Sequence, residues 1–200
     1  MLRCPEPHEE NVLVMSTGEM LGRMVRSGIL GCPVCQREYP IVRGVVHFSG
    51  SREQGAVPDA APASTAPRSL LPTDPPTLQA LLDLSGPGGY VVLVGSAARH
   101  AVGLAGLMGG IHFVGVNAPS DVEELPILSL LACGTMVPLR HAMARAVVVG
   151  GADATGSWLA EAERVLLRGR RLVVERDDAP LPPGITRLAA AKGVLVGERR

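Results

Sequence analysis

Two patterns of apolar residues alternate along the second half of this chain. Short unbroken apolar runs, typical of strands buried on both faces, occur at 90–94, 111–116, 127–131, 145–149 and 171–175. The stretch 156–168 instead repeats apolar side chains at helical spacing, with Leu159, Ala162, Val165 and Leu166 on one face. Strands that alternate with helical stretches predict an α/β domain built on a largely parallel sheet.

Capping residues set the limits of the remaining predicted helices. Thr77 after Pro76 is the expected N-cap of a helix at 77–84, and Ser120 that of a short helix at 119–125. Gly169 is expected to end the helix at 156–168 as its C′ residue. A small-residue helix is predicted at 98–108, and a final β-hairpin at 185–188 and 193–197.

Composition divides the chain into three parts. Residues 1–49 contain three of the four cysteines and short β-like runs. Residues 50–76 are rich in proline and alanine, so they predict an extended linker that lets the first part dock on its own chain or on a partner. Residues 77–200 contain the α/β pattern, so we expect a small β-rich module, a linker and one α/β domain.

Charge and aromatic content exclude several function classes. The 19 basic and 19 acidic residues cancel, so the basic excess of a nucleic-acid-binding protein is missing. Aromatic residues make up only 2% of the chain, too few for base-stacking platforms. No stretch has the roughly 18 apolar residues of a membrane span, and no apolar signal region follows Met1. We therefore expect a cytoplasmic protein whose apolar surface faces a protein partner or a larger complex.

Three cysteines and one histidine predict a metal site in the first part. Cys32 and Cys35 form a C-x2-C pair, and Cys4 and His8 form a C-x3-H pair upstream. Two such pairs joined by strands suit a tetrahedral zinc ribbon, and a module of this size needs such a constraint. Four protein ligands leave no open position, so the zinc would be structural. Pro7 stands where a second cysteine is expected, which leaves open a three-ligand site, an empty site or reduced buried thiols.

The first part resembles the Trm112-like zinc-ribbon family over residues 2 to about 48. The resemblance is carried by 2–5, by 28–35 and by 37–45, where Tyr39-Pro40-Ile41 precedes a turn at Gly44. Members of this family are small proteins or N-terminal modules that support methyltransferases, often by burying an apolar strand of the partner. The resemblance therefore implies a zinc-ribbon fold and a protein–protein role.

Residues 77–200 resemble a class I S-adenosylmethionine-dependent methyltransferase, chiefly along 156–175. The resemblance implies a Rossmann-like sheet with helices on both faces. It places the glycine-rich cofactor loop at 93–99, where Leu93 replaces the acid and Gly95 alone of three glycines remains, with Ala97 and Arg99 at the other two. The ribose-binding acid falls on Asn117. Two further acids fall near Cys133 and on Arg145.

These replacements leave a degenerate cofactor site formed by Gly95, Ser96, Ala97 and Asn117. An amide cannot accept hydrogen bonds from two ribose hydroxyls as a carboxylate can. One such loss is tolerable, but the losses at the loop, at Asn117, near Cys133 and at Arg145 together mean that S-adenosylmethionine binding is not expected. Arg99 and Arg145 could instead form an anion site or be paired elsewhere. His100, His112 and His141 have no supporting Ser, Cys or Asp at useful spacing, so no catalytic residue is assigned.

The leading hypothesis is therefore a non-catalytic methyltransferase-like protein that acts as an accessory or structural subunit. The alternative is a divergent but active S-adenosylmethionine-dependent methyltransferase, with Asn117 binding the ribose. A third hypothesis is a nucleotide-binding module that uses the turn at Gly95, although the second and third glycines of such a fingerprint are missing. An open cleft above Gly95 would favour the active methyltransferase or the nucleotide-binding module. A cleft filled by side chains would favour the non-catalytic protein.

Overall fold

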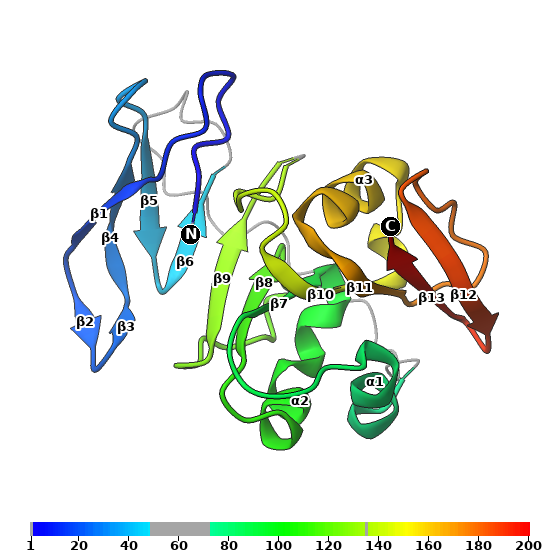
Figure 1. The fold of residues 1–200 in the computed structure, drawn as a ribbon. Helices are drawn as coiled ribbons and strands as arrows, with labels where there is room; N and C mark the ends of the chain where they lie inside the picture. Colours follow the sequence, from blue (N-terminus) through cyan, green and yellow to red (C-terminus); the bar gives the residue numbers. More distant parts are fainter. Residues whose placement is uncertain (1, 49–72, 135) are drawn as a thin grey trace.

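A computed structural model describes residues 2–48, 73–134 and 136–200, and its main feature is one sheet that runs through the whole molecule (Figure 1). Among the described residues this sheet has eleven strands, in the order β1-β4-β5-β6-β9-β8-β7-β10-β11-β13-β12. Most of the predicted linker 50–76 lies outside the described residues. No helix among the described residues is long and apolar enough to cross a membrane.

The N-terminal module is an antiparallel meander. Its strands are β1 (Val14–Thr17), β4 (Ser27–Gly31), β5 (Glu38–Val42) and β6 (Val45–His47). A separate small hairpin consists of β2 (Met20–Leu21) and β3 (Met24–Val25). The meander is β-rich, as the sequence predicts.

The second part of the sheet contains seven strands. Five are parallel: β7 (Tyr90–Val94), β8 (His112–Val116), β9 (Leu128–Ala132), β10 (Ala144–Val149) and β11 (Leu166–Val174). The predicted final hairpin is confirmed as β12 (Ile185–Ala191) and β13 (Val194–Arg199), and β13 pairs antiparallel with β11. Numbered within this part, the order is 3-2-1-4-5-7-6. The predicted Rossmann-like, methyltransferase-type sheet is confirmed.

Helices cover both faces of this part of the sheet. Helices α1 (Pro75–Leu82) and α2 (Ala101–Leu107) pack on one face, together with the 3-10 helix η1 (Gly95–His100). Helix α3 (Gly156–Val165) packs on the other face and buries Leu159, Ala162 and Val165. Figure 1 shows α3 on one side of the strands and α1 and α2 on the other. Successive residues of β7 and β10 pack into the two cores alternately, because side chains alternate across a strand.

Three local predictions are wrong at helix ends. The N-cap of α1 is Asp74, whose Oδ1 accepts a hydrogen bond from the Thr77 amide at 3.0 Å, and prolines occupy the first two helical positions. Helix α3 ends at Val165, because Leu166 pairs with Ala144 and so begins β11. Gly169 consequently lies within β11 at φ +67° and does not cap the helix.

The predicted helix at 119–125 does not form. The segment is a series of turns, in which the Val122 amide donates to the Pro119 carbonyl oxygen at 3.0 Å and Leu125 forms a bridge with Leu128. A favourable N-cap and an acidic first turn do not suffice, because so short a helix lacks the length to overcome nucleation. The connection from β8 to β9 is therefore irregular.

The N-terminal module is joined to the α/β part by strand pairing. Strand β6 pairs parallel with β9, so that Val45 faces Leu130 and Val46 faces Leu131. The Phe48 amide extends this pairing by donating to the Ala132 carbonyl oxygen at 2.7 Å. At the N-terminus, Leu2 forms a β-bridge with Leu139. The module therefore lies against its own α/β part, which the sequence left undecided.

Candidate functional site

The four predicted metal ligands come together at the top of the N-terminal module. Cys32 follows β4, Cys35 lies in the turn before β5, and Cys4 and His8 lie in the N-terminal loop. Their ligand atoms all lie within 4.8 Å of one another. Cys4 and Cys32 are buried, His8 is half-buried and Cys35 is exposed. This group can hold a metal ion.

Two separations in this group match those around a tetrahedral ion. The Sγ atoms of Cys4 and Cys35 lie 3.7 Å apart, and His8 Nε2 lies 3.4 Å from Cys32 Sγ. Zinc bonds of about 2.3 Å to sulfur and about 2.0 Å to nitrogen give tetrahedral edges of about 3.5 to 3.8 Å. His8 Nδ1 donates to the Glu9 carbonyl oxygen at 2.7 Å, which directs Nε2 towards the cysteines.

The environment of the thiols distinguishes them chemically. Burial raises the pKa of Cys4 to about 11, while Tyr39, whose hydroxyl oxygen lies 3.2 Å from its Sγ, opposes that shift. Burial would also raise the pKa of Cys32, but the backbone amides of Cys35 and Val34 lower it to about 7. Cys32 is therefore more readily ionised for metal binding than Cys4.

The predicted cofactor loop is occupied by the chain's own carboxylate. Gly95 directly follows β7 at φ +62°, and a Cβ placed there would overlap the Asp153 carboxylate. Asp153 belongs to η2 (Gly151–Asp153), which follows β10. Burial raises the pKa of Asp153, and a hydrogen bond from the Ser96 amide opposes this rise. The close approach that glycine permits is thus used by the turn after β10.

Asn117 is also engaged by its neighbour at the sheet edge. Its Nδ2 donates to the Cys133 carbonyl oxygen at 3.0 Å, and its Oδ1 accepts from the Cys133 amide at 2.8 Å. It has φ +51°, a conformation that asparagine tolerates well. The side chain therefore continues the pairing of β8 with β9 beyond their ends, and both of its polar groups are used.

Arg99 and Arg145 do not form the anion site considered as an alternative. Arg99 makes a two-pronged ion pair with Asp121, with Nε at 2.9 Å from Oδ2 and Nη2 at 3.0 Å from Oδ1. Arg145 donates to the carbonyl oxygens of the loop before β7, at Ser85, Gly86, Pro87 and Gly88. Arg99 therefore joins the turn after β7 to the turn after β8. Arg145 supports the loop before β7, at the opposite end of the strands.

A buried pair that sequence reasoning missed adds a further link. His100 Nε2 lies 2.6 Å from Glu175 Oε1, and the two side chains are 0% and 2% exposed. His100 ends η1 and Glu175 follows β11, so the pair links the turn after β7 to the end of β11. The sequence signal was weak, because a charged residue directly after an apolar strand is ordinary.

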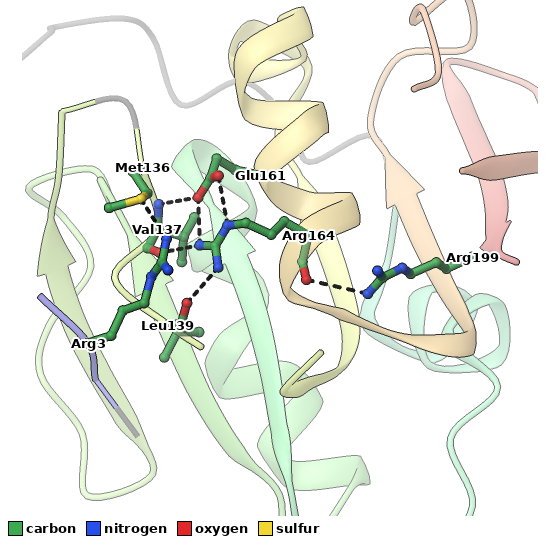
Figure 2. Close-up of polar contacts among 7 residues, drawn as sticks. All are labelled: Arg3, Met136, Val137, Leu139, Glu161, Arg164 and Arg199. Carbon is green, nitrogen blue, oxygen red and sulfur yellow. Dashed lines mark hydrogen bonds and ion pairs between the residues drawn. The ribbon is translucent and has the colours of Figure 1, made fainter. Parts of the chain in front are cut away.

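The connection from β9 to β10 is fixed by a charged cluster (Figure 2). Arg164 forms a two-pronged pair with Glu161 and donates to the carbonyl oxygens of Leu139, at 2.8 Å, and Val137, at 2.6 Å. Glu161 in turn accepts from the Val137 amide at 2.8 Å. Figure 2 shows Arg3 reaching the same segment through Met136, at 2.9 Å. Helix α3 and the N-terminal segment thus hold one loop.

Comparison with known proteins gives weak similarities only. No family model matches the chain, and no curated protein matches it. Among solved structures, a complex of the Haloferax volcanii Trm112 methyltransferase activator and the putative methyltransferase is 19% identical, with TM-score 0.39, covering 48% of this chain and 49% of that one. A geranyl diphosphate C-methyltransferase of Streptomyces coelicolor is 16% identical, with TM-score 0.42, covering 50% and 41%.

A third solved structure is covered over most of its length. An S-adenosylmethionine-dependent methyltransferase of Aquifex aeolicus is 18% identical, with TM-score 0.47, covering 66% of this chain and 92% of that one. The chain spans less than half of the length of the other two. The fold assignment therefore rests on the strand order and on the two helical layers described above.

Proposed function

We propose that this chain is a non-catalytic methyltransferase-like protein that serves as an accessory or structural subunit of a larger assembly. In this proposal residues 1–49 form a zinc ribbon, 50–76 a linker and 77–200 a methyltransferase-like domain. The observation that carries the proposal is that other parts of the chain occupy the predicted cofactor positions, with the Asp153 carboxylate at Gly95 and the Cys133 backbone on the Asn117 side chain. The sheet is retained, while the groups that would bind the cofactor are used for stability.

Three contacts support a closed cofactor cleft. Asp153 fills the space at Gly95, and Asn117 is hydrogen-bonded through both polar atoms to Cys133. Arg99 joins the first two turns through Asp121. A cofactor would have to break several of these contacts, and each charged hydrogen bond lost is worth about 1.5 to 3 kcal/mol. Its affinity would fall accordingly.

The metal in this proposal is structural zinc held by Cys4, His8, Cys32 and Cys35. Bound there, zinc would supply folding free energy to a module that has little core of its own. The module supports the end of the large sheet through β6, so the metal would stabilise the surface offered to a partner. The resemblance to Trm112-like proteins, which act through protein contacts, agrees with this role.

The alternative is a divergent active S-adenosylmethionine-dependent methyltransferase. Gly95 favours it, because a glycine at positive φ directly after the first parallel strand is the feature that cofactor loops need. This alternative requires Asp153 to leave Gly95 and Asn117 to release Cys133. It therefore predicts a rearrangement of both turns on binding.

The experiment is calorimetric titration of the purified full chain with S-adenosylmethionine, with zinc content measured on the same sample. We expect no heat of binding and about one zinc per chain. Cys32→Ser should lose the metal, whereas Cys133→Ser, at a buried cysteine outside the group, should retain it. Micromolar binding of the cofactor would contradict the proposal, and zinc-free wild-type protein would contradict its metal site.

A further inference from the structure

Within the described residues the large sheet ends at two edge strands, β1 and β12. They are the outermost strands of the order, and Figure 1 shows them at opposite ends of the molecule. Natural edge strands are usually protected by charges, prolines or bulges, because their unpaired backbone groups attract another strand. An edge without such protection is a candidate surface for strand pairing.

Strand β12 carries this protection, and β1 does not. The register of β12 shifts between Arg187 and Ala189, Arg187 is exposed, and Lys192 directly follows the strand. Strand β1 pairs with β4 in regular register and lies in a stretch, 11–18, that contains neither a charged residue nor a proline. All of its residues are exposed. The β1 edge is therefore open to pairing with another strand.

The hydrogen bonds between β1 and β4 identify the backbone groups that face the open edge. The Gly18 amide donates to the Ser27 carbonyl oxygen at 2.8 Å, so the Gly18 backbone faces β4. Backbone groups alternate in direction along an antiparallel strand, so the Ser16 backbone also faces β4. The N–H and C=O groups of Met15 and Thr17 consequently point away from β4, towards the edge.

The open stretch is bounded at both ends. Before it, the Leu13 amide donates to the Leu2 carbonyl oxygen at 3.3 Å, so the outer side of Leu13 is already paired. After it, the hairpin becomes irregular at Glu19, whose carbonyl oxygen accepts from two consecutive amides of the opposite arm. The backbone groups available to a further strand are therefore those of Met15 and Thr17.

We infer that β1 pairs antiparallel with β1 of a second copy of this chain, so that two sheets join across a two-fold axis. A register centred on Ser16 places Met15 opposite Thr17 of the second copy, and the reverse. This register uses the outward groups of both residues on both chains, because residues that exchange hydrogen bonds lie directly opposite each other. The inference goes beyond the proposed function and does not depend on it.

The side chains of β1 complement themselves in this register. Val14, which is 62% exposed in the single chain, lies opposite Gly18 of the second copy, so a large side chain meets a residue without one. Ile29 of β4 lies beside Ser16 on the same face and is 40% exposed. Pairing covers this apolar surface, and an uncharged edge offers nothing to a charged partner. A second β1 edge is the uncharged strand that the chain itself provides.

The test places charge at the residue on the two-fold axis. Ser16 faces Ser16 of the second copy at about 4.5 Å between Cα atoms, so Ser16→Lys sets lysine against lysine, and Ser16→Glu sets glutamate against glutamate. Analytical ultracentrifugation of the zinc-loaded full chain measures the assembly. We expect wild-type dimers with a dissociation constant of about 10 μM, and dimers at least about tenfold weaker for each variant.

Mixing the two variants distinguishes this pairing from any other dimer. In an equimolar mixture lysine faces glutamate, so we expect dimers of about wild-type affinity. Ser157→Lys makes the same change at an exposed serine of α3 and is the matched control, which should dimerise as the wild type does. A mixture that associates no better than the separate variants would overturn the inference.

A second measurement needs no variant. In the wild type, amide hydrogen exchange at Met15 and Thr17 should slow as the protein concentration rises, whereas exchange along the outer edge of β12 should not. Dimers without this protection would overturn the inference, as would a wild type that stays monomeric at about 1 mM, which would leave the edge to a strand of another protein. Failure of the proposed function is distinguishable, since it appears as cofactor binding in the calorimetric titration.

Discussion

At the scale of single residues, Asn117 has a structural role at the position where the sequence resemblance places a ribose-binding acid. A carboxylate only accepts hydrogen bonds, whereas the amide both donates to and accepts from the Cys133 backbone. Asparagine also suits φ +51° at this position. An amide at this position is therefore explained by its contribution to local stability.

Restoring the acid should cost stability and should not restore cofactor binding. Asn117→Asp loses the donor to the Cys133 carbonyl oxygen and places negative charge beside it, so we expect a loss of about 1 to 3 kcal/mol in unfolding free energy. Urea denaturation measures this loss. Asn11→Asp makes the same chemical change where the structure shows only a backbone contact, and it should be nearly neutral. Equal stability of Asn117→Asp and the wild type would contradict this role.

Asp153 should make stability depend on pH. Burial raises its pKa in the folded protein, so the folded state binds its proton more tightly than the unfolded state does. Its contribution is therefore present below the ordinary aspartate pKa and is lost as pH rises through the folded pKa. Asp153→Asn retains an acceptor for the Ser96 amide and should become more stable relative to wild type as pH rises. Thermal unfolding between pH 3 and 7 measures the difference, and a difference that shrinks with rising pH would contradict the assignment.

At the scale of elements, helix α3 holds a loop as well as covering the sheet. Arg164 reaches Glu161 and two carbonyl oxygens of the segment between β9 and β10 (Figure 2). In a segment without a helix, these bonds replace the internal hydrogen bonds that a helix would have provided. The Arg164 guanidinium is thus the group that fixes the connection from β9 to β10.

Arg164→Lys tests this role while keeping the charge. Lysine cannot reproduce the planar fork that serves Glu161 and the two carbonyl groups, so we expect a loss of about 2 kcal/mol in unfolding free energy. Arg168→Lys, at an exposed residue of β11, is the control and should be within about 0.5 kcal/mol of wild type. Guanidinium denaturation compares the two, and similar values for both variants would show that the fork is dispensable.

Helices and strands with strong local patterns could be predicted from the sequence. The distant segments that they contact in the fold could not. The valine runs of β7 and β10 predict both strands to within one residue, because a buried parallel strand needs continuous apolar side chains. Helix ends were misplaced where pairing overrode them, as at Leu166. Asp153 at Gly95 and the His100–Glu175 pair join turns more than 50 residues apart, so only the folded sheet brings them together.

At the scale of the whole molecule, the pairing of β6 with β9 makes the module part of one sheet. The four candidate metal ligands lie beside β4 and β5, and β5 pairs directly with β6. Loss of the metal should therefore destabilise the strands on both sides of the junction between β6 and β9. The spacing within Cys4–His8 and within Cys32–Cys35 predicts a Cys/His cluster, because each pair is local in sequence, while the junction rests on contacts between distant segments.

Metal removal tests this continuity. After chelation we expect faster amide hydrogen exchange in β4 to β6 and also in β9, which contains no ligand but loses its paired neighbour. Strands β10 and β11, at the centre of the α/β part, should keep their protection. Exchange measured by mass spectrometry with and without a chelator distinguishes the outcomes. Unchanged protection of β9 would show that the two parts are independent.

The most direct test of a closed cofactor cleft is a nuclear magnetic resonance titration with S-adenosylmethionine. The amide signals of Gly95, Ser96 and Asn117 in the full, zinc-loaded chain report on the positions where the cofactor would lie. We expect these signals to remain unshifted up to millimolar cofactor. The Asp153 carboxylate already fills the space at Gly95, and the Cys133 backbone already uses both polar groups of the Asn117 side chain. Saturable micromolar shifts confined to these amides would contradict a closed cleft and would identify a working cofactor site.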